Sequence, residues 1–216
     1  MMRCLATALF FLVLGIHSAG AQTSQVTAPE SPTPLSATPF YRAYSDHPVI
    51  EQATESVDMT SSVRSVLADS ASPLALRLAI VNALGSHTLP DGYTDAWWRE
   101  LGYEAAPSGG TEGSNPKITP DFYLLYAYMM ALENQLRPEE VEPIVAVGVT
   151  ALSGSIAAQM IGLLITSQRL LFDGEWCMIW KNTETVLVNQ DLDRDLRPGA
   201  VAIIAEFLGT YEQDCS

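Results

Sequence analysis

Apolar residues recur at intervals of three and four positions from Val49 onward, and polar residues occupy the positions between them. This is the period of a helix that buries one face and exposes the other. We therefore expect the folded domain to begin with an amphipathic helix. Its buried stripe consists of Ile50, Ala53, Val57, Val63 and Leu67.

Several later helices are predicted from a capping residue followed by proline, a pair that is typical of helix starts. Ser72-Pro73 precedes an apolar stretch that ends at Gly85, and Thr119-Pro120 precedes a second stretch. Positions 122–132 are apolar on nearly every side, so we expect that helix in the centre of the protein. Further helices are expected at 95–101 with Thr94 as the cap, after Pro138, and from Pro198 onward.

These patterns together predict an all-α protein with one helical domain over residues 49–216. Both an irregular helical bundle and a short array of helix pairs agree with them. Residues 105–118 are rich in glycine and are expected to form a flexible connection inside the domain.

The stretch from Ile144 to Gln168 carries no charged residue and has two interpretations. It is long enough for one membrane-spanning helix. Alternatively, it forms two buried helices that are separated at Ser153-Gly154-Ser155, where glycine and serine weaken helix propensity. We favour two helices because serines and threonines dilute the stretch and no aromatic belt precedes it. Small residues at Thr150, Gly154, Ala158 and Gly162 lie four positions apart and would form a ridge on one helical face, where another backbone could approach closely.

Residues 175–188 are rich in aromatic and β-branched side chains. Such residues favour strands, so a small β-hairpin that turns at 181–183 is one interpretation. A helix is the other. The pattern does not decide between them.

The first 21 residues have the three parts of a secretory signal peptide. Arg3 provides the positive charge, an apolar stretch follows, and Ala19-Gly20-Ala21 is a cleavage site, so cleavage is expected after Ala21. Residues 22–48 are rich in Pro, Ser and Thr and are expected to be a disordered leader. The mature chain is therefore expected in the periplasm or outside the cell.

The chain is strongly acidic, with a formal net charge of −14. Its only lysines, Lys117 and Lys181, lie far apart in the sequence. Nucleic acids are bound by clustered basic residues, so a nucleic-acid partner is not expected. The negative charge is more compatible with cationic partners than with nucleic acids, and it also increases solubility.

Two cysteines, Cys177 and Cys215, remain after removal of the signal peptide. An even number of cysteines in an exported protein favours a disulfide between them. The alternative is two free thiols. A bridge would connect the last helix with the tryptophan-rich segment that precedes it.

The segment from Leu67 to Gly85 resembles the second half of a HEAT-type helical repeat. The matching residues are Asp69 before the turn, Arg77 early in the second helix, and Ala83-Leu84-Gly85 at its end. The resemblance covers one helix pair and implies packing of paired helices. Solenoids need several regularly spaced units, and that spacing is absent here.

The sequence contains none of the common catalytic motifs of serine hydrolases, zinc proteases, nucleotide-binding proteins or thiol redox proteins. After processing, the histidines are His47 and His87, and neither belongs to a recognisable catalytic group. We therefore assign no catalytic residue, cofactor or metal. Two acidic residues that are close in the sequence, Glu100 and Glu104, could serve as a carboxylate pair for a sugar substrate only if the fold fixes their separation.

Oxygen-bearing side chains alternate at Asn189, Asp191, Asp193 and Asp195, as in the first half of a calcium-binding loop. The glycine and glutamate that such loops require further on are missing. We interpret the segment as a solvated acidic turn that caps the last helix, and calcium is not the expected ligand.

Trp97 and Trp98 are neighbours on a predicted helix, so their side chains diverge by about 100 degrees and one of them is expected to be exposed. Together with Tyr93 and Tyr103 they form our candidate partner-contact surface, because tryptophan and tyrosine are enriched in interface anchors. The alternative is a small satellite core beneath the glycine-rich loop.

The sequence thus favours an exported, non-catalytic helical protein that binds or organises another protein in the cell envelope or outside the cell. One alternative is a membrane-anchored accessory subunit with a spanning helix at 144–168. The other is a carboxylate-dependent enzyme that acts on cell-wall or carbohydrate material.

Overall fold

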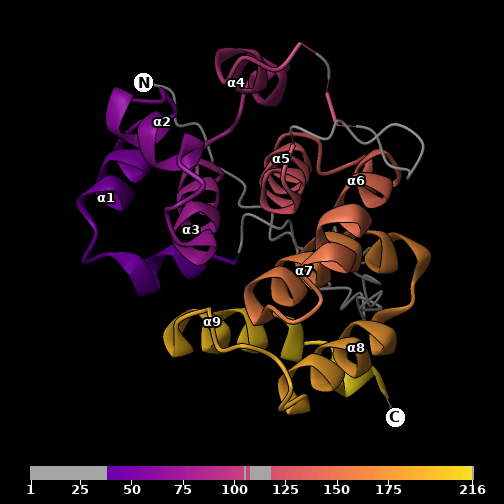
Figure 1. The fold of residues 1–216 in the computed structure, drawn as a ribbon. Coiled ribbons are helices and arrows are strands. Elements are labelled where there is room, and N and C mark those ends of the chain that lie inside the picture. Colours follow the sequence, from indigo (N-terminus) through magenta and orange to yellow (C-terminus); the bar gives the residue numbers. More distant parts are fainter. Residues whose placement is uncertain (1–37, 105, 108–117, 216) are drawn as a thin grey trace, which may run out of the picture. The chain divides into compact units, whose positions relative to one another are not determined.

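A computed structural model describes residues 38–104, 106–107 and 118–215. Within these residues the chain forms nine α-helices and two short 3₁₀ helices and has no β-strand (Figure 1). The all-α helical bundle that was predicted is confirmed. The elements are η2 (Phe40–Tyr44), α1 (Pro48–Glu55), α2 (Ser61–Ala68), α3 (Leu74–Leu84), α4 (Tyr93–Glu100), α5 (Pro120–Glu133), α6 (Pro138–Ala151), α7 (Ile156–Asp173), α8 (Trp176–Val188), α9 (Pro198–Gly209) and η3 (Glu212–Cys215).

Helix α5 is the central element of the bundle. Its side chains from Phe122 to Met129 are all buried, and it packs against α3, α4, α6 and α7. Figure 1 shows α5 between α3 and α6. The helix begins at Pro120 directly after Thr119, as predicted. A helix that is apolar all round is stable only when neighbours cover every side, and α5 has such neighbours.

The amphipathic pattern that starts at Val49 belongs to two helices rather than one. Helix α1 ends at Glu55, and Ser56 is extended with φ −150°. Thr60 then caps α2 by accepting a hydrogen bond from the Val63 N–H. Serine and threonine side chains offer the backbone local hydrogen bonds that compete with a continuous helix. The period of the apolar residues therefore continues across a break in the backbone.

The folded part begins earlier than the predicted boundary at residue 49. Phe40 is fully buried, Tyr44 is 4% exposed, and the Tyr41 N–H donates to Asn82 Oδ1 at 3.0 Å. Residues 38–48, which were predicted to belong to the disordered leader, are therefore packed against α3 and α9. The apolar residues here are too few to show a helical period, and this explains the error. The predicted signal peptide, the cleavage site after Ala21 and residues 22–37 lie outside the described residues.

The uncharged stretch at 144–168 forms two helices, α6 and α7. They are separated at Leu152–Ser155, where Ser155 caps α7 by accepting from the Ala158 N–H at 3.0 Å. The two-helix interpretation is confirmed, and a single spanning helix over this stretch is wrong. In the described portion of the chain, no helix is long and apolar enough to cross a membrane.

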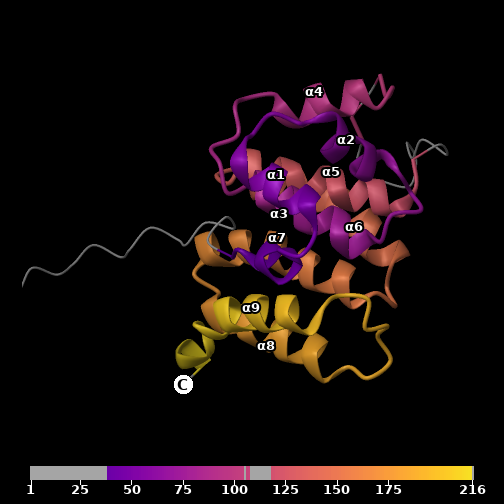
Figure 2. The same ribbon diagram turned by 90° about the vertical axis from the view of Figure 1, so that its left-hand side faces the viewer.

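Residues 176–188 form helix α8, so the β-hairpin alternative is wrong. Gly174, with φ 76°, ends α7 in the left-handed conformation that glycine adopts without strain, and α8 starts two residues later. Ile179 and Thr183 are buried on one face of α8. The spacing of four between them is helical, and it outweighs the strand preference of the individual residues. Figure 2 shows α8 beside α9, and the two helices pack together.

Helices α2 and α3 form the helix pair on which the HEAT resemblance rests. They contact each other, and Arg77 of α3 is 2% exposed and paired with Asp121 at the start of α5. Membership in that repeat class stays a prediction. The glycine-rich connection falls mainly on residues that the structure does not describe.

Candidate functional site

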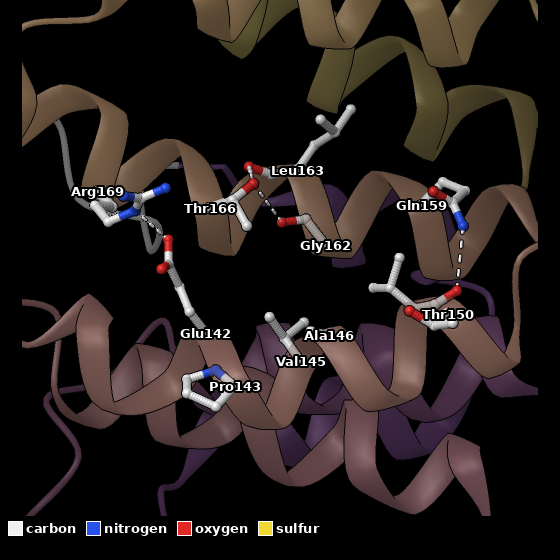
Figure 3. A pocket seen from close by; sticks show the side chains of 11 residues that line it. Glu142, Pro143, Val145, Ala146, Thr150, Gln159, Gly162, Leu163, Thr166 and Arg169 are labelled. Carbon is white, nitrogen blue, oxygen red and sulfur yellow. Dashed lines mark hydrogen bonds and ion pairs between the residues drawn. The ribbon is translucent and has the colours of Figure 1, made fainter. Parts of the chain in front are cut away.

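A groove of about 610 Å³ lies between α6 and α7 (Figure 3). Its volume exceeds the 440 Å³ of a second cavity at the C-terminal end of α5. Its size is within the range of ligand-binding clefts in proteins. One wall comes from α6 and the other from α7, so a hairpin of two consecutive helices forms the whole site.

Helix α6 has two apolar faces, and only one of them is buried in the core. Val141, Ile144, Val145 and Gly148 face the bundle. A Cβ at Gly148 would lie 3.1 Å from the Leu124 backbone N, so the absence of a side chain brings α6 close to α5. Because this face of α6 packs against α5, the other face of α6 is left to line the groove. Its residues on α6 are Glu142, Pro143, Val145, Ala146, Val149 and Thr150, of which Val145 also contributes to the core.

The wall formed by α7 follows the helical spacing of three and four. Its members are Gln159, Gly162, Leu163, Thr166 and Arg169. Gly162 marks a close approach of the two walls, because a Cβ there would lie 2.7 Å from Val149 Cγ2. The predicted ridge of small residues is therefore only partly realised. Gly162 does permit close packing, but Thr150 and Gly154 belong to α6 and to the turn.

Polar side chains close the two ends of the groove. At one end, Arg169 Nε lies 2.5 Å from Glu142 Oε1, and this ion pair joins the two helices (Figure 3). Arg169 also approaches Asp173 on its own helix at 3.7 Å. At the other end, Gln159 Nε2 donates to the Val149 carbonyl at 3.4 Å. The space between these ends is lined mainly by aliphatic and small side chains.

The polar groups of the groove are engaged with one another or with the backbone. Glu142 and Arg169 neutralise each other, and the hydroxyl of Thr166 donates to the Gly162 carbonyl at 2.9 Å. A nucleophile needs an adjacent base, and the groove lining contains neither a histidine nor a cysteine. Contact with an apolar ligand would remove this aliphatic surface from water and thereby favour binding.

The two tryptophans of the predicted aromatic contact surface are buried, whereas Tyr93 and Tyr103 are half-buried. Trp97 and Trp98 are 2% and 1% exposed, so the expectation that one indole faces solvent is wrong. Trp98 stacks on Tyr103, with ring centroids 4.2 Å apart, and meets the edge of Tyr126. Both tryptophans belong to the main hydrophobic core rather than to a separate satellite core.

Burial of both indoles has a tertiary cause. Trp98 faces α5, whereas Trp97 lines a small cavity together with Met59 and Arg64, from the segment that leads into and forms α2. Tyr93 extends this packing, because its hydroxyl donates to the Val57 carbonyl at 2.5 Å. Burial, with smaller contributions from the nearby carboxylates of Asp58 and Glu100, raises the pKa of Tyr93 to about 12. The segment from Val57 to Arg64 therefore lies beside α4.

The other side chains whose chemistry could serve catalysis do not come together in one group. Ser86 Oγ donates to the Ala83 carbonyl at 2.6 Å, while His87 Nε2 is buried without a partner in the described chain. They are not hydrogen-bonded to each other. Glu100 pairs with Arg64 at 2.9 Å, so its carboxylate is engaged with a cation. Among the described residues there is no cluster of three His, Cys, Asp or Glu side chains that could hold a metal ion.

The acidic turn at 189–195 caps a helix other than the predicted one. Asp195 accepts hydrogen bonds from the Ser155 hydroxyl and the Ala157 N–H, so it caps α7. The last helix, α9, follows Arg197 and has no side-chain cap. The prediction that the turn caps α9 is wrong, because the chain folds back onto the start of α7 before α9 begins.

The predicted disulfide between Cys177 and Cys215 is present. It joins the first turn of α8 to η3 at the C-terminal end. The presence of only two cysteines after the signal-like segment was sufficient to indicate this pair.

The groove itself was not identified from the sequence. The signal that could have revealed it is the recurrence of small or polar residues at three- and four-residue spacing along 159–169, opposite the buried stripe of α7. Glu142 and Arg169 are 27 positions apart, and only the helix hairpin brings them together.

Comparison with protein-family models, with curated proteins and with solved structures finds no match for this chain. Function is therefore inferred from the geometry and chemistry of the described residues alone.

Proposed function

We propose that this chain is an exported, non-catalytic helical binding protein that holds a short apolar segment of another protein in the α6–α7 groove. The observation that carries this proposal is the mainly apolar lining between two polar ends. Such a surface recognises side chains by contact area, and the polar ends limit the length of the segment that fits.

The dimensions of the groove indicate the kind of segment. Its α6 wall runs from Glu142 to Thr150, which corresponds to about 12 Å along a helix axis. This length matches about two turns of a bound helix. Helices that bind in grooves present apolar side chains at spacings of three and four, so we expect a partner with that pattern.

Placement outside the cytoplasm is part of the proposal. The signal-like sequence at residues 1–21 and the paired cysteines both support an oxidising compartment. A role within an envelope or extracellular assembly follows from binding a protein partner there. The carbohydrate-enzyme alternative gains no support, because Glu100 is paired with Arg64.

Site-specific photocrosslinking in the organism that makes the protein tests the proposal. A photoreactive phenylalanine derivative would replace Ala146, which is exposed and lines the groove. The matched control places the same group at Ala202, which is exposed on α9 and does not line the groove. We expect a discrete crosslinked protein from position 146 that is absent from position 202.

A groove-filling substitution provides the second test. Ala146→Trp should abolish co-purification of the crosslinked partner, whereas Ala202→Trp should leave it unchanged. Both variants should melt within a few degrees of the unmodified protein, because both positions are exposed. Identical crosslinking from both positions, or retention of the partner by Ala146→Trp, would contradict groove binding.

A further inference from the structure

The α6–α7 groove carries its charged residues at one end. Of the described residues that line it, only Glu142 and Arg169 are charged, and Figure 3 shows them together at the end away from Thr150 and Gln159. At this end α6 begins and α7 finishes. The positive end of one helix dipole therefore meets the negative end of the other, and the two largely cancel. The charged side chains thus decide the sign of the potential here.

Acidic side chains outnumber basic ones at this end of the hairpin. Residues 137–142 and 169–173 include four carboxylates and two guanidinium groups, which gives a net charge of −2. The carboxylates belong to Glu139, Glu140, Glu142 and Asp173. Arg137 is engaged by Glu140 at 2.8 Å, so Arg169 is the cation that faces the groove.

Two of these carboxylates converge on the Arg169 guanidinium. Glu142 Oε1 lies 2.5 Å from Arg169 Nε, and Asp173 Oδ2 lies 3.7 Å from Arg169 Nη1. One positive charge therefore serves two negative charges at a single place, and one negative charge is left over. The side chain of Asp173 is 52% exposed, so its carboxylate is accessible to a further donor.

A backbone carbonyl adds an acceptor beside these side chains. Pro143 lies inside α6 and lines the groove. Proline has no N–H, so it cannot donate to the carbonyl of Glu139, four residues earlier, as another residue would. Residues four apart lie on the same face of a helix, which places this carbonyl toward the charged end of the groove. Acceptors therefore exceed donors there, independently of the side-chain charges.

We infer that the apolar segment held in the groove carries a lysine or arginine at the end that lies over Glu142 and Asp173. This inference rests on the function proposed above and specifies the chemistry of the partner. The ammonium or guanidinium supplies the donors that the excess acceptors lack, while its aliphatic stem continues the apolar contact. A fatty acid or another apolar anion fits less well, because Arg169 is already engaged by two carboxylates.

Calorimetric titration of the purified exported chain with three synthetic peptides tests the inference. Each peptide is an alanine-rich helix of about 16 residues, long enough to be partly helical alone, with leucines spaced three and four apart. The first has two lysines at one end, the second has the same composition with its lysines in the middle of the polar face, and the third has glutamines in place of lysines. We expect the lysine-ended peptide to bind about two- to fivefold more tightly than either of the others, as for a partly exposed ion pair.

Substitutions in the protein separate the local charge from the charge of the whole chain. Asp173→Asn should remove most of the preference for the lysine-ended peptide. Glu206→Gln removes the same charge from an exposed position on α9 and should preserve the preference. Ala146→Trp should block all three peptides, because it fills the groove.

The outcomes distinguish this inference from groove binding itself. Equal binding of the three peptides, each blocked by Ala146→Trp, would overturn the inference and leave groove binding intact. An equal loss of preference in Asp173→Asn and Glu206→Gln would do the same. Absence of saturable binding by the lysine-ended peptide, or binding that Ala146→Trp does not block, would also overturn the inference, and crosslinking from position 146 then decides separately on groove binding.

Discussion

The carboxylate of Asp195 accepts a hydrogen bond from the backbone N–H of Ala157 at 3.0 Å, across 38 positions of sequence. The same carboxylate accepts from the hydroxyl of Ser155, the N-cap of α7, at 2.6 Å. The N-terminus of α7 thus has two side-chain oxygens that satisfy its first N–H groups. One wall of the groove therefore depends on the segment that precedes α9.

Replacing Asp195 with alanine should destabilise the fold through the loss of this cap. We expect the free energy of unfolding to fall by about 1–2 kcal/mol, since a helix cap and a charged hydrogen bond are lost together. The melting temperature should fall by about 2–8 °C, as measured by circular dichroism. Asp191→Ala is the matched control, because Asp191 is exposed in the same turn and does not cap α7. Equal losses in the two variants would contradict the capping role.

Arg77 and Asp121 form a buried ion pair between α3 and α5, and Asp121→Asn should be strongly destabilising. Arg77 is 2% exposed, and its Nε and Nη1 atoms have no other partner among the described residues. The substitution would leave this guanidinium buried opposite a neutral amide. Breaking a buried pair typically costs about 3–5 kcal/mol. Urea denaturation at pH 7 measures the loss, and a change below about 1 kcal/mol would contradict the assignment.

The same pair should make stability depend on pH. Burial alone would raise the pKa of Asp121, but hydrogen bonds from Thr119 and Arg77 and the charge of Arg77 outweigh it, so the pKa is lowered. A carboxyl whose folded pKa is below its unfolded value of about 3.9 stabilises the protein above that value. This contribution should be lost as the pH falls below about 4. Urea denaturation between pH 2 and 7 should show a shallower acid loss for Asp121→Asn, and identical pH profiles would contradict the prediction.

Gly162→Ala should destabilise the α6–α7 hairpin although alanine favours helix formation. The new methyl group would lie 2.7 Å from Val149 Cγ2, and the χ1 angle of valine is restricted in a helix. We expect a net loss of about 1–3 kcal/mol from overpacking. The double variant Gly162→Ala/Val149→Ala should recover most of this loss in thermal denaturation. Additive losses of stability would show that the methyl group at position 162 does not clash with Val149, and would contradict the prediction.

The disulfide should contribute to stability through the 38-residue separation of its cysteines. In the chain-entropy model, closing such a loop contributes about 4 kcal/mol. The Cys177→Ser/Cys215→Ser variant should lose stability by up to this amount. The chain without residues 1–21, which lacks Cys4, should resist alkylation until a reductant is added. Rapid alkylation of the oxidised, folded protein would contradict the pairing.

The positions and types of many helices could be predicted from local sequence. Thr119-Pro120 starts α5, the serine-glycine turn near 154 separates α6 from α7, and the period from Pro198 identifies α9. These signals are local because capping, proline geometry and helix propensity act within a few residues of the chain. The Cys177–Cys215 pair could also be predicted, since the chain has a single pair of cysteines after the signal-like segment.

Only the tertiary structure decided which faces of these helices are covered. Trp97 and Trp98 diverge as helix geometry requires, yet both are buried, and aromatic residues of α5 pack against Trp98. Asp195 caps α7 rather than α9, and Glu133 replaces Thr94 as the cap of α4. In each case the deciding partner lies more than 20 positions away in the sequence. A helical period specifies that one face will be buried, but the partner that buries it depends on how distant helices pack.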